Sequence, residues 1–172
     1  MNSNIISWNG KKPIISDKAY VAHNATIIGD VHIGSESSIW FNVVIRGDVN
    51  FIRIGSRSNI QDGTIIHVSS AGLSTNIGDE VLVGHNALLH ACTLKNKTFV
   101  GMAATIMDDS VVESHSIVAA GSLVLGGTQI PSGEVWGGSP AKFLRKVKEI
   151  EIKDFPNQIQ RYVDLSKDYK KL

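Results

Sequence analysis

The sequence repeats a simple pattern every six residues over most of its length. From Ile15 to Trp136, an aliphatic or aromatic residue occupies each sixth position in four uninterrupted runs. The fourth residue after most of these positions is Ala, Val, Ser or Thr. The twenty apolar positions are Ile15, Val21, Ile27, Ile33, Ile39, Ile45, Ile54, Ile60, Ile66, Ile77, Val83, Leu89, Leu94, Val100, Ile106, Val112, Val118, Val124, Ile130 and Trp136. A six-residue period is typical of a parallel β-helix, in which short strands stack coil on coil around one core.

The period predicts an all-β solenoid. In the left-handed parallel β-helix that the pattern resembles, three hexapeptides form one triangular coil, so twenty positions predict between six and seven coils. We expect this β-helix to cover residues 1–140, with the atypical stretch Met1 to Pro13 capping the first coil. Residues 141–172 lose the period, and Ile159, Tyr162 and Val163 have helical spacing. They predict a C-terminal helical extension packed on the same domain, with Pro156 in the first turn.

Three interruptions of the repeat mark the positions where loops can leave the solenoid. The step is nine residues between Ile45 and Ile54, eleven between Ile66 and Ile77, and five between Leu89 and Leu94. Insertions in a solenoid are tolerated at its corners, where they form loops that can carry function. All three interruptions lie near histidines or charged residues, so we expect the functional site there.

Composition excludes several classes of function. The net charge is +1 with both signs dispersed, which provides no basic surface for nucleic acid. No apolar run approaches the ~20 residues that cross a bilayer, and the start does not resemble a signal peptide, so we expect no membrane partner and a cytosolic location. The single cysteine, Cys92, rules out an intrachain disulfide and lies within the repeat, where a small semi-buried residue is expected.

Three of the six histidines have positions that suggest a metal site. His67 and His90 each follow an apolar position by one residue, and these positions are three hexapeptides apart once the insertion is discounted. Their imidazoles should therefore stack on adjacent coils, at about the 4.8 Å spacing of neighbouring strands, where they could share one metal. His85 lies at a corner about 16 Å of extended chain from His90, so a second subunit of a threefold oligomer could supply it. Unrelated surface histidines are the alternative, as for His23, His32 and His115.

At these residues the sequence resembles the gamma-class carbonic anhydrase family of hexapeptide-repeat proteins. The resemblance covers essentially the whole chain and rests on motifs in order and spacing: Arg46-Gly47-Asp48, Asn59-Ile60-Gln61-Asp62, His67, Gly84-His85 and Leu89-His90. It implies a homotrimer with His67, His85 and His90 as ligands of Zn²⁺ or Fe²⁺, divided between neighbouring subunits. The activity implied is reversible hydration of carbon dioxide to bicarbonate, through attack by metal-bound hydroxide.

The same resemblance assigns roles to further residues. Arg46 would bridge to Asp48 and Asp62 across the subunit interface, unless it forms only a weak surface ion pair. Gln61 would orient water or bicarbonate, and Asn59 would support the site or stabilise a corner. A further catalytic candidate is Tyr162, which could reach over the site from the C-terminal helix or serve as a core residue.

The sequence departs from well-characterised members of this class in its route for protons. Val49 occupies the position of a glutamate that follows their Arg-x-Asp motif, and the segment from Val68 to Thr75 has no acidic residue. The ligand set therefore predicts metal binding more securely than rapid hydration. Three alternatives remain: a hexapeptide acyltransferase with one histidine as general base, a metal-dependent thioesterase, and a non-catalytic metal-binding trimeric scaffold.

Overall fold

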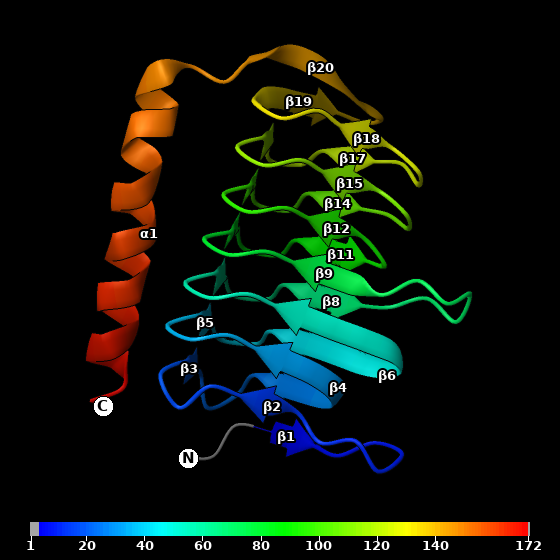
Figure 1. Cartoon of the computed structure of the whole chain (residues 1–172), viewed down its shortest axis with the longest axis vertical. Helices are drawn as coiled ribbons and strands as arrows, with labels where there is room; N and C mark the ends of the chain where they lie inside the picture. The colour runs from blue at the N-terminus through cyan, green and yellow to red at the C-terminus, as the bar shows by residue number, and fades with distance from the viewer. Residues whose placement is uncertain (1–3, 172) are drawn as a thin grey trace.

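The computed structural model describes residues 4–171, and these form a parallel left-handed β-helix with one C-terminal helix (Figure 1). The expected cap residues Met1 to Ser3 and the terminal Leu172 lie outside the described residues. Each coil is a triangle whose three sides stack on the sides of the coils before and after it. We name the three resulting surfaces face one, face two and face three, after the order in which the chain passes through the positions Ile15, Val21 and Ile27.

The register of the strands confirms the six-residue count. Every apolar position pairs directly with the position three hexapeptides away, as Ile27 pairs with Ile45, Ile45 with Ile66 and Ile66 with Leu89. Face one consists of β2 (Ile14–Ile15), β9 (Thr75–Ile77), β12 (Thr93–Leu94), β15 (Val111–Val112) and β18 (Gln129–Ile130), with the ends of β4 (Thr26–Ile33) and β6 (Val44–Ile54). Face two consists of β3 (Tyr20–Val21), β5 (Ser38–Ile39), β7 (Asn59–Ile60), β10 (Leu82–Val83), β13 (Phe99–Val100), β16 (Ile117–Val118) and β19 (Glu134–Gly138). Face three consists of β1 (Asn4–Ile6), β8 (Ile65–His67), β11 (Leu88–His90), β14 (Thr105–Ile106) and β17 (Leu123–Val124), with the starts of β4 and β6.

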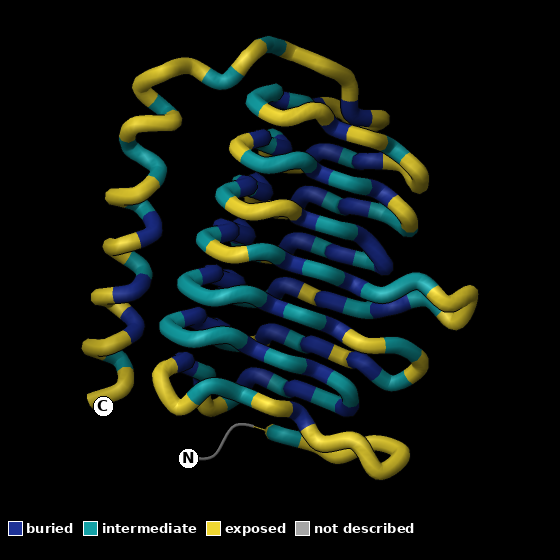
Figure 2. Tube along the Cα trace, viewed as in Figure 1, coloured by how far each residue is buried: buried dark blue, intermediate teal, exposed yellow. Residues whose placement is uncertain are grey.

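The apolar positions form one continuous core. Seventeen of the twenty are buried, and Ile15, Val21 and Trp136, which lie at the two ends, are partly buried against the same cluster. Burial of this column removes apolar surface from water at ~25 cal/mol per Å² and is the main stabilising contribution of the solenoid. Figure 2 shows the resulting alternation of buried and more exposed residues in every coil.

All three interruptions of the repeat lie at one corner, between face three and face one. β6 crosses this corner as a continuous strand, residues 68–74 form a loop between β8 and β9, and only a short turn separates β11 from β12. The rule of a buried small residue four places after each apolar position fails here, as Val49 shows with 57% exposure. Because the irregular steps displace the count, the residues two places before the next apolar position are the buried ones, namely Ile52, Thr75 and Cys92.

The C-terminal segment differs from the prediction at its start. Residues Ala141–Lys146 form strand β20, which pairs antiparallel with β19, instead of the first turns of a helix. This pairing satisfies the edge of the last coil, and Ala141 is buried against the core. Helix α1 (Glu149–Tyr169) starts where the Glu151 carboxylate accepts the Lys148 backbone N–H at 2.8 Å. Pro156 is therefore the eighth residue of α1, and its expected place in the first turn was wrong.

Helix α1 runs back along the solenoid and covers face two (Figure 1). Its Ile159 and Val163 pack on Leu82, while Tyr162 and Tyr169 pack on an aromatic cluster that contains Trp40. None of the helices described within residues 4–171 is long and apolar enough to cross a membrane.

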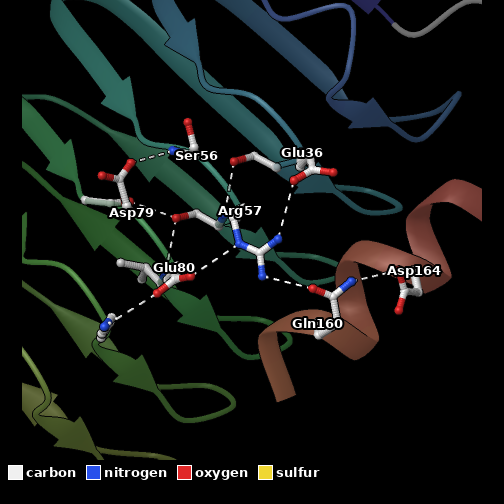
Figure 3. Close-up of polar contacts among 12 residues, drawn as sticks. Glu36, Ser56, Arg57, Asp79, Glu80, Gln160 and Asp164 are labelled. Carbon is white, nitrogen blue, oxygen red and sulfur yellow. Dashed lines mark hydrogen bonds and ion pairs between the residues drawn. The ribbon is translucent and has the colours of Figure 1, made fainter. Parts of the chain in front are cut away.

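A ladder of charges attaches α1 to the corner between face one and face two (Figure 3). Arg57 contacts Glu36 on the previous coil at 3.4 Å, Glu80 on the next coil at 3.2 Å, and the Gln160 amide of α1 at 3.1 Å. Lys167 of α1 lies 3.2 Å from Glu36. The three ladder residues Glu36, Arg57 and Glu80 all adopt left-handed backbone conformations three places after an apolar position, which aligns their side chains in one column.

Candidate metal centre

His67 and His90 are direct neighbours on face three. They end strands β8 and β11, and the two residues are partners in the parallel register. The Nδ1 atom of His67 lies 3.1 Å from the Nε2 atom of His90, and both side chains are partly buried. The prediction that these imidazoles stack on adjacent coils is confirmed.

Asp48 contacts the His67 ring nitrogen that does not face His90, here called the outer nitrogen. Its Oδ1 atom lies 3.0 Å from His67 Nε2, and its Oδ2 atom accepts a hydrogen bond from the Arg46 guanidinium. Burial opposes ionisation of this carboxyl, but the contacts with His67 and Arg46 outweigh burial and lower the pKa of Asp48. Asp48 is therefore ionised, and it lies in the first of the three interruptions, between Ile45 and Ile54. The expected pairing of Arg46 with Asp48 occurs within one chain.

Asp108 makes the equivalent contact with His90, although no sequence motif had pointed to it. Its Oδ1 atom lies 2.5 Å from His90 Nδ1. Burial again opposes ionisation, but the contact with His90 outweighs burial and lowers the pKa of Asp108, with a smaller contribution from Ser69. A count of coils could have found this residue, because Asp108 follows Ile106 by two places and Ile106 pairs with Leu89.

His85 lies at the other edge of face three, at the corner with face two. Its Nδ1 atom lies 2.9 Å from Asp62 Oδ2, and the His85 side chain is 43% exposed. Within the described residues 4–171, no group of three or more His, Cys, Asp or Glu side chains comes together to hold a metal. One chain therefore brings together His67, His90, Asp48 and Asp108 at one edge, and His85 with Asp62 at the other.

Gln61, Asn59 and Tyr162 belong to face two rather than to the histidine pair. Gln61 is 5% exposed and directly precedes Asp62. Asn59 is buried, and its amide donates to Ser38 Oγ at 2.8 Å while its Oδ1 atom has no partner among the described residues. Tyr162 packs edge to face on Trp40 with ring centroids 6.5 Å apart. Within a single chain, these three residues therefore lie on the side of His85 and Asp62.

Each of the three histidines has a carboxylate partner on one of its ring nitrogens. His67, His85 and His90 each have one ring nitrogen against a carboxylate and the other nitrogen directed away from it. Carboxylate partners of this kind fix the orientation of metal-binding histidines and increase their basicity. Cys92 offers no competing ligand, because it is fully buried and burial raises its pKa to about 12.

Comparisons with known proteins find relatives over nearly the whole chain. The sequence profile of the bacterial transferase hexapeptide family (six repeats) matches residues 12–47. Gamma carbonic anhydrase 1, mitochondrial, of Arabidopsis thaliana is 52% identical over 91% of this chain, and the chain spans 58% of that relative's length. The carbonic anhydrase of Geobacillus kaustophilus is 40% identical over 98% of this chain and 92% of its own length.

A solved structure extends the match to three dimensions. The hexapeptide transferase family protein from Anaplasma phagocytophilum superposes with a TM-score of 0.93 at 45% identity, and the match covers 96% of this chain and 98% of that one. The sequence identity extends over nearly the full length of the Anaplasma protein and of the Geobacillus relative. The similarity therefore includes the sequence as well as the fold. The chain belongs to the gamma carbonic anhydrase-like family of hexapeptide-repeat proteins.

Proposed function

We propose that this protein is a metal-dependent carbonic anhydrase that hydrates carbon dioxide reversibly at the interfaces of a homotrimer. The ligands would be His67 and His90 of one subunit and His85 of the partner subunit. The observation that carries the proposal is the pair of facing nitrogens, His67 Nδ1 and His90 Nε2, 3.1 Å apart between two carboxylates.

A proton count explains why this pair suits a cation. Two neutral imidazoles carry two N–H groups, and the carboxylates of Asp48 and Asp108 attract both of them to the outer nitrogens. Two lone pairs then face each other, which is unfavourable unless a positive charge lies between them. Two nitrogens bound tetrahedrally to one metal at about 2.1 Å would be ~3.4 Å apart. The observed 3.1 Å separation is close to this value, so the residues fit a metal.

Each residue then has a role in holding or serving the site. Zn²⁺ or Fe²⁺ bound by three histidines supplies Lewis-acid chemistry, lowering the pKa of water from ~15.7 towards 7 so that a nucleophile for carbon dioxide is available at neutral pH. Asp48 holds the proton on His67 Nε2, and Arg46 compensates the charge of Asp48. Gln61 would arrive beside His85 from the partner subunit and orient the substrate through its amide. Proton export would rely on buffer or on another group, because Val49 and the 68–75 segment offer no acidic residue.

The surface of face three supports the trimeric assembly. The edge with His67 and the edge with His85 flank this face, so a neighbour that contacts it could bring the two together. Face three also carries exposed apolar residues, Ile65 at 47% and Leu125 at 50% exposure, which an interface would cover. The cytosolic location stays a prediction, since the Arabidopsis relative is named mitochondrial.

The test is stopped-flow hydration of carbon dioxide by protein whose zinc and iron contents have been quantified. His90→Ala should lose both metal and activity. His115→Asn is the matched control, because His115 is exposed at a distant corner and Asn tolerates its left-handed backbone. Metal-replete wild type that is no faster than His90→Ala would contradict the activity and redirect the search to thioesters or to a scaffold. Protein that binds no metal would contradict the site itself.

A further inference from the structure

We propose that Asp108 is the positioning residue for His90, fixing which nitrogen of that imidazole faces the shared site. This inference rests on the proposed metal site and adds a residue to it. The contacts of the Asp108 side chain and its place in the stack of coils both support this role.

Four side chains form a symmetrical column on face three. Along the solenoid the order is Asp48, His67, His90 and Asp108, each contributed by the next coil. The contacts along this column measure 3.0 Å, 3.1 Å and 2.5 Å. Asp48 therefore contacts His67 from one side as Asp108 contacts His90 from the other, through the nitrogen that faces away from the shared site in both cases. The symmetry assigns Asp108 the same task as Asp48.

The imidazole of His90 needs such a partner. The ring-flip torsion of histidine has two broad wells, so packing alone does not distinguish Nδ1 from Nε2. An anion beside Nδ1 stabilises the proton there and leaves the lone pair on Nε2, the nitrogen that faces His67. Without this carboxylate, the proton can occupy Nε2 and the ring then presents no lone pair to the site.

The insertion that follows His67 brings a hydroxyl group close to the Asp108 carboxylate. Ser69 lies in the 68–74 loop close to Asp108, and the Ser69 backbone N–H donates to the Leu73 carbonyl at 3.0 Å, which closes the loop on itself. The five extra residues in this step of the repeat thus bring Ser69 near Asp108, the last residue of the column. Ion pairs of Asp108 within the described residues involve His90 only, so His90 is its one charged side-chain partner there.

The experiment compares Asp108→Ala and Asp108→Asn with Asp109→Asn in the full-length protein. Asp109 is the adjacent exposed carboxylate, and Asn suits its left-handed backbone, so Asp109→Asn matches the loss of charge without touching His90. Zinc affinity is measured by chelator competition, and the His90 tautomer by imidazole ¹⁵N chemical shifts in metal-free protein. We expect Asp108→Ala to bind zinc ~10–100-fold more weakly, as for other outer-shell partners, and to lose the Nδ1–H form of His90.

The two readouts separate this inference from the proposed function. If wild type binds no zinc, the proposed function fails, and the tautomer of His90 in metal-free protein still decides the role of Asp108. Asp108→Asn keeps the shape and an acceptor oxygen, so it should fold and give an intermediate affinity. An unchanged His90 tautomer in Asp108→Asn and Asp108→Ala, with zinc affinity within about twofold of Asp109→Asn, would overturn the proposal, because outer-shell partners normally change affinity by more.

Discussion

Mixing two inactive variants provides the sharpest test of a site divided between subunits. His67→Ala removes a proposed ligand from the edge of face three that carries His90, whereas His85→Ala removes the proposed ligand at the other edge. Each variant alone lacks one ligand at all three interfaces of a trimer. A mixed trimer can rebuild a site wherever an intact His67 edge meets an intact His85 edge.

The magnitude follows from counting interfaces. Equal amounts of the two subunits, unfolded and refolded together, give about three quarters mixed trimers if they assemble at random. Whether a mixed trimer contains one or two copies of a variant, a single interface of its three joins an intact His67 edge to an intact His85 edge. The expected activity and bound metal are therefore about a quarter of the wild-type values.

The assay is carbon dioxide hydration together with metal content, and mixing is verified by mass spectrometry of differently tagged subunits. A mixture of His67→Ala with His90→Ala is the matched control, because both substitutions affect the same edge and no arrangement rebuilds a site. If verified mixed trimers of His67→Ala and His85→Ala stay as inactive as this control, the reasoning that divides the site between chains is refuted.

Two further predictions concern the attachment of α1. Arg57→Asn should lower the free energy of unfolding by ~1–2 kcal/mol, because it removes contacts with Glu36, Glu80 and Gln160 while keeping a residue that tolerates the left-handed backbone. Urea unfolding checks this against His115→Asn at an equivalent corner, and equal midpoints would contradict it. Hydrogen bonds from Arg145 lower the pKa of Glu151 from 4.5 to about 2, so its stabilising effect is present above pH 4.5 and is lost as the pH falls through 2. Thermal unfolding of wild type and Glu151→Gln should therefore converge as the pH falls from 5 to 2, and a constant gap would rule out this contribution.

The solenoid was predictable because a single spacing determines it. Each apolar position buries its own side chain and also fixes the neighbour on the next coil, so counting hexapeptides is enough to place His67 beside His90. The end of the solenoid was not predictable in this way. Ala141–Lys146 lacks the period because β20 pairs antiparallel with one strand, and nothing in the local sequence distinguishes such a closing strand from the start of the helix.

The candidate site was predictable in its histidines and less so in its carboxylates. His67, His85 and His90 could be placed by their distance from apolar positions, and Asp48 was connected to Arg46 by a motif. Asp108 was missed because it lies in an uninterrupted stretch of the repeat, where no insertion draws attention to it. Only the register of coils brings it next to His90, and its direction of approach depends on side-chain geometry that spacing does not specify.

The position of the interruptions explains how a regular scaffold carries an irregular site. The flat faces cannot accept extra residues without breaking strand register, whereas a corner can, and all three changes of step occur at the corner next to His67 and His90. The first insertion carries Asp48, the second carries Ser69, and the shortened step follows His90 directly. The opposite edge of face three keeps the regular step and carries His85 with Asp62. One chain therefore presents the two unlike halves of the proposed site on either side of one face. Because unlike halves can meet only between different chains, the same arrangement that separates the ligands would make assembly a condition for binding the metal.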